Sequence, residues 1–177
     1  GVIIHCDIMN FGGIMFLLSV DDATDYMMAV QIKSKGKEEL LKAITMISAA
    51  YTSYGWKVNR LCSDREGGIS AIREELNKMD IQLYRSEAQG HAATAERAIK
   101  TIKYKARAVI NELVFKLPEM WIKYLIEFTI QGCNNVTNKK TRSRTPQQMV
   151  TSRGLSNTFN LVFGDLIISK APYIDKA

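Results

Sequence analysis

Apolar positions in the first third of the chain form three short runs separated by turn residues. The runs cover residues 2–9, 14–20 and 26–33, with Gly12-Gly13 in the first gap and an Asp-rich turn at residues 21–25 in the second. Short apolar runs bounded by Gly and Asp are typical of β-strands. The pattern therefore predicts a three-stranded meander.

The pattern then changes to a helical period. Over residues 37–54 apolar side chains recur every three or four positions, and Gly55 follows the last of them. A strand at 58–63, a helix at 69–79 and a strand at 81–84 are predicted next. Because strand–helix–strand units place parallel strands in one sheet, we predict an α/β fold with a mixed five-stranded sheet flanked by helices.

The second half of the chain is predicted to be mainly helical. Residues 85–93 are polar and have no period, which indicates a surface loop before a long helix at 92–113. Another amphipathic helix follows Pro118 and fades near Asn134, and we place its aromatic residues Trp121 and Phe128 in the core. Residues 145–148, Thr-Pro-Gln-Gln, predict a capped helix start, and residues 161–169 predict a strand.

Composition narrows the class of protein. The chain has 177 residues, 46% of them hydrophobic, and 24 Lys and Arg against 18 Asp and Glu, for a net charge of +6. This balance favours a polyanionic partner. The three cysteines are widely spaced in apolar segments, so we expect buried thiols in a reducing compartment, and the two histidines make no zinc-module pattern. We see no membrane-length apolar run or leader, and we interpret the start at Gly1-Val2 as that of a fragment.

Three acidic residues lie where the pattern predicts the edges of a buried sheet. Asp7 is in the first strand, Asp64 closes the strand at 58–63, and Glu96 is predicted in the first turn of the long helix. A carboxylate in a mostly apolar strand is costly to desolvate unless it is paired, hydrogen-bonded or bound to a metal. Oxygen-only ligation suits Mg²⁺ or Mn²⁺. Each acid could instead be a cap, a turn residue or half of a salt bridge.

Basic residues form two candidate phosphate-binding groups. Lys100, Lys103 and Arg107 share a helix face with Glu96, and residues 139–144 form a basic loop. Cations of this kind add sequence-independent affinity for nucleic acid. The alternatives are a solvated helix face supported by Glu-to-Lys attraction and a solvated turn.

Three motifs together resemble the catalytic core of retroviral-type integrases, and in particular those of copia-like retrotransposon polyproteins. The motifs are His-Cys-Asp-Ile-Met at 5–9, Ser-Asp-Arg-Glu-Gly-Gly at 63–68 and Gly-His-Ala-Ala-Thr-Ala-Glu-Arg at 90–97. The likeness covers about residues 2–150, and the Thr-Pro helix start at 145 also resembles that family.

The resemblance implies a ribonuclease-H-like fold and two-metal-ion polynucleotidyl transfer, in which element DNA ends are trimmed and joined to target DNA. Asp7, Asp64 and Glu96 would be the catalytic and metal-binding residues: Asp7 would bridge two Mg²⁺ or Mn²⁺ ions, Asp64 would bind one and Glu96 the other. Residues 1–153 would form the catalytic core and 154–177 an extension or linker. A homo-oligomer acting on DNA inside the cell, in the nucleus, is expected. The expected DNA contacts are Arg97, Lys100, Lys103, Arg107, Lys139, Lys140, Arg142 and Arg144.

The chain departs from the family pattern in places. Only 31 residues separate Asp64 from Glu96, which is fewer than is usual there, and Arg65 puts a cation beside the site. Neither the zinc-binding N-terminal module nor the C-terminal DNA-binding portion of the family has a counterpart. Two alternatives stay open: a metal-dependent ribonuclease on the same fold, and a retired or domesticated fragment kept for DNA binding. Neither Ser63 nor Cys62 has a credible base partner, which argues against serine or cysteine catalysis.

Overall fold

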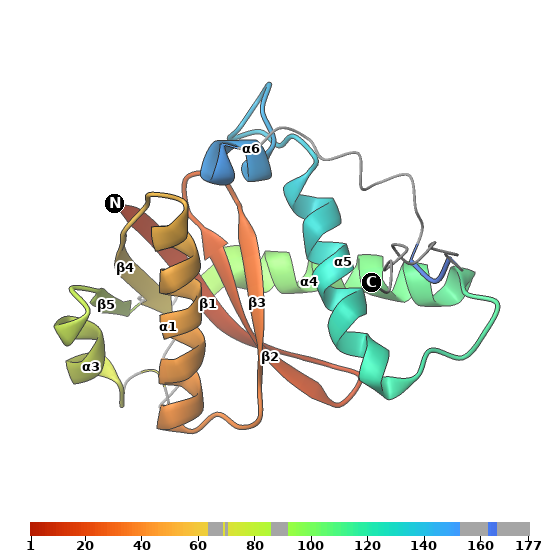
Figure 1. The fold of residues 1–177 in the computed structure, drawn as a ribbon, viewed down its shortest axis with the longest axis horizontal. Helices are drawn as coiled ribbons and strands as arrows, with labels where there is room; N and C mark the ends of the chain where they lie inside the picture. The colour runs from red at the N-terminus through yellow and green to blue at the C-terminus, as the bar shows by residue number, and fades with distance from the viewer. Residues whose placement is uncertain (64–68, 70, 86–91, 153–162, 166–177) are drawn as a thin grey trace, which may run out of the picture.

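A five-stranded mixed sheet forms the centre of the structure (Figure 1). The computed structural model describes residues 1–63, 69, 71–85, 92–152 and 163–165. Strands β3, β2 and β1 are antiparallel, β4 and β5 continue the sheet parallel to β1, and the order is β3-β2-β1-β4-β5. This confirms the predicted meander and the mixed sheet. The strands are β1 (Val2–Phe11), β2 (Ile14–Asp21), β3 (Met27–Ile32), β4 (Val58–Ser63) and β5 (Gln82–Arg85).

A two-residue hairpin connects β1 to β2 and sets their register. Phe11 pairs with Ile14, and the two residues between them, Gly12 and Gly13, have φ values of 58° and 81°. Glycine adopts positive φ without a Cβ clash, and paired positive values are typical of hairpin turns that follow the sheet twist. A Cβ on Gly12 would also lie 2.3 Å from a side-chain carbon of Ile122, so the turn packs closely on a helix.

Two helices cover one face of the sheet. Helix α1 (Lys37–Ser53) lies across the sheet, with α3 (Arg73–Lys78) beside it near β5 (Figure 1). The apolar positions that predicted α1, including Leu40, Ile44 and Ile47, are fully buried against Ile4 and Leu61 of the sheet. This core also includes Val150 of α6 (Pro146–Thr151).

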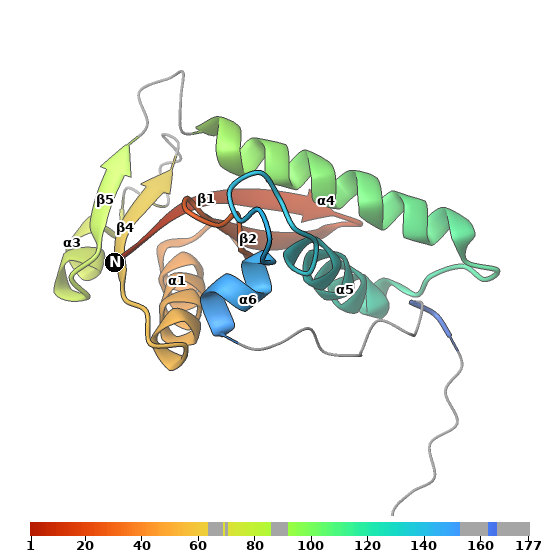
Figure 2. The same cartoon turned by 90° about the horizontal axis from the view of Figure 1, so that it is seen from above.

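The other face packs against α4 (Ala92–Glu112) and α5 (Ile122–Asn134), which follows the short 3-10 helix η1 (Glu119–Trp121). Ile102 and Ala106 of α4 are fully buried, as the predicted apolar stripe requires. Helix α4 contacts β1 and β2, and Figure 2 shows β4 and β5 lying to one side of it. The α4-side face of β4 and β5 is therefore not under this helix.

Several boundaries differ from the sequence predictions. Helix α3 begins only at Arg73, after a turn at residues 71–72, although Ile69, Ile72 and Leu76 are all buried. Apolar residues spaced three or four apart indicate that one side of a segment is buried. A turn followed by a helix buries the same side chains as a continuous helix, so the spacing does not distinguish the two. Trp121 was wrongly placed in the core: it lies in η1, is 41% exposed and packs edge-to-face on Phe115.

The capped helix start is confirmed. The Thr145 hydroxyl accepts a hydrogen bond from the Gln148 backbone N–H, and the Gln148 side chain accepts one from the Thr145 backbone N–H. Within the predicted strand at 161–169 only residues 163–165 are described; residues 163–164 form a turn, so the strand is wrong there. Most of the predicted loop at 85–93, residues 86–91, lies outside the described residues.

Candidate active site

Asp7 lies on the central strand of the sheet, beside the last described pair between β1 and β4. The parallel register pairs His5 with Cys62 and Cys6 with Ser63, and Asp7 is the next residue of β1. Its side chain is partly exposed, and Oδ1 accepts a hydrogen bond from the Ile8 backbone N–H at 2.7 Å. The alternation of β1 puts Asp7 on the same face as Met9, which packs under α4.

Glu96 lies on α4, which packs against β1. Because α4 begins at Ala92, Glu96 is its fifth residue and not in the first turn as predicted. Its carboxylate is exposed and forms an ion pair with Lys100 one turn later, at 3.0 Å. Both side chains are more than half exposed, so this contact contributes little to stability and leaves Glu96 accessible to a ligand.

Asp64, the third predicted acid, lies outside the described residues. Within the described part of the chain, no three His, Cys, Asp or Glu side chains are grouped as a metal site would require. The structure therefore brings together the strand of Asp7 and the helix of Glu96, while the complete three-acid set stays a prediction.

The cysteines beside these acids are poor nucleophiles. Cys6 and Cys62 are buried on neighbouring strands, and burial raises the pKa of both thiols; the Arg60 guanidinium partly opposes the rise at Cys62. A raised pKa leaves little of the reactive thiolate at neutral pH. The prediction of buried thiols is confirmed for these two, whereas Cys133 is partly exposed.

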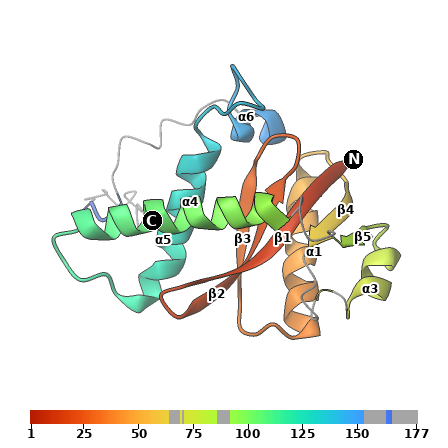
Figure 3. The same ribbon diagram turned by 180° about the vertical axis from the view of Figure 1, so that it is seen from behind.

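The first basic group lies on α4, the helix that crosses the sheet in Figure 3. Lys100 and Arg107 are exposed and Lys103 is partly exposed, on the flank that carries Glu96. They follow Glu96 at steps of four, three and four residues, so successive cations are about one helical turn apart. DNA contact by this flank stays a prediction.

A second basic surface lies on the opposite flank of α4. Arg97, Thr101 and Lys105, spaced four residues apart, line a groove of about 430 Å³ with Lys139 and Lys140 of the α5–α6 loop. The sequence analysis did not include Lys105 among the expected DNA contacts. Its spacing of eight residues from Arg97, about two helical turns, could have placed both on one side of the helix. We call this surface the α4–loop groove.

The wall of the α4–loop groove is held by hydrogen bonds to the β2–β3 turn. The Lys140 Nζ contacts Asp25 Oδ1 at 2.8 Å and the Asp22 carbonyl at 2.6 Å, and Asn138 Nδ2 donates to the Thr24 carbonyl at 2.8 Å. Lys140 is therefore partly neutralised. Arg142 and Arg144 are exposed but do not line the groove, and Arg144 donates to the Gln148 carbonyl at 3.0 Å.

Comparison with solved structures finds a known fold with this architecture. The chain is similar to the catalytic core domain of BIV integrase, with a TM-score of 0.66 and 15% sequence identity over 85% of this chain and 93% of that one. No protein-family model and no curated protein matches the sequence. No described helix is long and apolar enough to cross a membrane. The strand order and flanking helices are those of a ribonuclease-H-like integrase catalytic core.

Proposed function

We propose that this chain is the catalytic core of an integrase, a polynucleotidyl transferase that joins retroelement DNA ends to target DNA. One observation carries the proposal. The parallel pairing of β1 with β4 runs to Cys6 and Ser63, and the next residue of the sequence after each is an aspartate, Asp7 and Asp64. A further step of this register would put two carboxylates side by side, on the side of the sheet where α4 carries Glu96.

Such a set fits divalent metal. Adjacent carboxylates repel one another unless a cation lies between them, and carboxylate oxygens are the donors that Mg²⁺ and Mn²⁺ prefer. Asp7, Asp64 and Glu96 would hold the two ions. Two bound metals supply activation of a water or 3′-hydroxyl and stabilisation of the leaving oxygen in in-line displacement.

The basic residues would position the DNA backbone. Lys100, Lys103 and Arg107 lie on the same flank of α4 as Glu96. They would therefore contact the phosphates next to the reacting bond. Arg97, Lys139 and Lys140 line the α4–loop groove, and Arg142 and Arg144 extend the positive charge of the loop. Cations neutralising phosphates supply affinity without sequence preference.

The wider assignments belong to the same proposal. Residues 1–153 would be the catalytic core and 154–177 its extension. The source would be a copia-like retrotransposon, and the protein would act as a homo-oligomer on DNA in the nucleus. The motifs around Asp7, Asp64 and Glu96 support these assignments.

Metal-dependent strand joining tests the proposal. Labelled DNA ends and target DNA are incubated with Mn²⁺ and the unchanged chain, Asp64→Asn or Glu96→Gln. Both variants should lose cleavage and joining and keep the thermal midpoint measured without metal. Glu112→Gln, an exposed acid at the end of the same helix, is the matched control and should retain activity.

The alternatives predict other outcomes. Cutting of an RNA–DNA hybrid in place of joining would replace the integrase with a ribonuclease. DNA binding with no metal-dependent chemistry in any form would indicate a retired fragment. Equal activity of Asp64→Asn and Glu112→Gln would contradict the proposed acids.

A further inference from the structure

The α4-side face of β4 and β5 presents an ordered set of side chains that leads toward Asp7. The register aligns Ile3, Arg60 and Gln82 in one row across β1, β4 and β5, and His5, Cys62 and Tyr84 in the next. The intervening Ile4, Leu61 and Leu83 pack into the core on the α1 side. One more step of two residues along β1 reaches Asp7.

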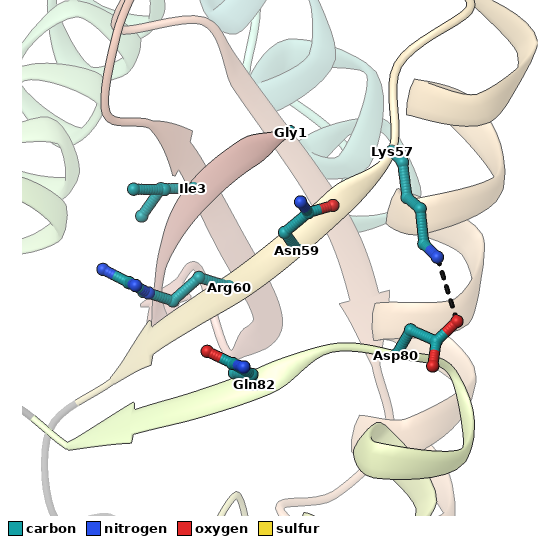
Figure 4. Close-up of a pocket in the computed structure, with 7 residues that line it drawn as sticks. All are labelled: Gly1, Ile3, Lys57, Asn59, Arg60, Asp80 and Gln82. Carbon is teal, nitrogen blue, oxygen red and sulfur yellow. Dashed lines mark hydrogen bonds and ion pairs between the residues drawn. The ribbon is translucent and has the colours of Figure 1, made fainter.

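This face is hollowed and polar. Figure 4 shows Ile3, Arg60 and Gln82 projecting from three neighbouring strands into a pocket of about 440 Å³. A β-bulge between Val2 and Ile3 makes Asn59 an extra residue of β4, which lines the same pocket. The Lys57–Asp80 ion pair, at 2.9 Å, lies at its border.

In the second row His5 and Cys62 are buried, whereas Tyr84 is exposed and lies beside Arg60 of the first row. The Arg60 guanidinium carbon lies 5.3 Å from the centre of the Tyr84 ring, and the Tyr84 residue is 53% exposed. Among the described residues, Arg60 makes no ion pair. We call Arg60, Gln82 and Tyr84 the sheet platform.

We propose that the sheet platform binds an unpaired strand of DNA, by stacking a base on Tyr84 and placing a phosphate at Arg60. An exposed aromatic ring with a cation beside it is suited to single strands, because their bases offer π-faces that a duplex keeps inside its stack. The chain's charge of +6 complements the ligand. The assignment to DNA rests on the proposed function, since the platform adjoins the strand that carries Asp7.

Binding without metal tests the platform. Fluorescence anisotropy in EDTA gives the Kd of a short labelled single-stranded DNA and of the matching duplex. Tyr84→Ala should weaken single-strand binding about five- to hundredfold and duplex binding less than about twofold. Tyr84→Phe, which keeps the ring, should bind like the unchanged chain. Arg60→Ala should lower the salt slope for the single strand by about 0.7.

Tyr124→Ala is the matched control. Tyr124 is 55% exposed on α5 and has the Lys123 Nζ 5.4 Å from its ring centre, so it shares the chemistry of Tyr84 without the sheet position. Its replacement should change neither Kd by more than about twofold. Melting curves of all variants check that the fold is kept.

Three results would overturn the platform: equal single-strand affinity for Tyr84→Ala and Tyr124→Ala, equal losses on single strand and duplex, or tighter binding of the same sequence as RNA. A chain that binds single strands through Tyr84 and joins no DNA would retain the platform and overturn only the integrase activity.

Discussion

Asn134, the last residue of α5, ties that helix to the edge strand of the sheet. Its Nδ2 donates to the Met27 carbonyl and its Oδ1 accepts from the Met27 backbone N–H, both at 2.8 Å. The residue is 3% exposed, so both polar atoms are satisfied by β3 and not by bulk solvent. The sequence indicated only that the helix ends here, because a side chain bridging positions 107 residues apart leaves no local pattern.

Replacing this amide should destabilise the fold. In Asn134→Ala the two Met27 backbone groups lose their partners, which should lower the free energy of unfolding by about 1–3 kcal/mol. Asn135→Ala is the control, since the Asn135 side chain donates to the Gln131 carbonyl within its own helix end, and it should change stability by less than about 0.5 kcal/mol. Urea unfolding curves measure both. Equal effects would mean that the bridge to β3 contributes nothing.

Thiol reactivity should separate the three cysteines. Burial raises the pKa of Cys6 and Cys62, whereas Cys133 is partly exposed in the α4–loop groove. At neutral pH an aromatic disulfide reagent should therefore label one thiol rapidly in the folded protein and three after denaturation. Cys133→Ser should abolish the rapid phase; a rapid phase that persists would show that Cys6 or Cys62 is accessible.

At the scale of elements, a single ion pair links α1 to α3. The Lys37 Nζ lies 2.7 Å from Glu75 Oε1, between the first residue of α1 and the first turn of α3. The hydrogen bond from Lys37 lowers the pKa of Glu75 below its ordinary value of 4.5 and raises that of Lys37. The contact should anchor a short helix that has no side-chain cap.

The anchor should weaken in acid. Because the pKa of Glu75 is depressed in the folded state, its stabilisation is present above the unfolded value and is lost as pH falls through the lowered folded value. The Tm advantage of the unchanged chain over Glu75→Gln should therefore shrink as the pH drops below about 4. Glu74→Gln, at the neighbouring position, keeps the Lys37–Glu75 pair and is the matched control. A constant gap for Glu75→Gln would contradict the pair.

Hydrophobic periodicity predicted the elements well where burial and hydrogen bonding coincide. In α4, Ala95, Ile102 and Ala106 recur at helical spacing because one face of the helix is buried. This spacing predicted both the helix and the face that packs on the sheet. The period misled at Ile72, which is buried in a turn, and aromatic character misled at Trp121. Local sequence patterns therefore predict which side chains are buried better than they predict the backbone conformation.

At the scale of the whole molecule, charged surfaces depend on distant segments. The α4–loop groove joins Lys105 to Lys139, and the sheet platform joins Arg60 to Tyr84. Neither pairing is readable from the sequence, because tertiary packing sets it. Asp7, Asp64 and Glu96 were readable as candidates from the sequence, since each lies in or next to a predicted element, and their joint geometry stays a prediction.

The two flanks of α4 should bind separate DNA segments. Lys103 and Lys105 are two residues apart and so about 200° apart around the helix, too far to contact the same phosphates. Lys103→Ala and Lys105→Ala should each lower the salt slope for duplex binding by about one, at every sequence tried. The double variant should lose about two, because independent sites are additive. Lys78→Ala on α3, remote from both flanks, should leave the slope unchanged. A double variant that binds no more weakly than either single variant would show that the two flanks share one contact. An unchanged salt slope in both single variants would show that these lysines are solvated and do not contact DNA.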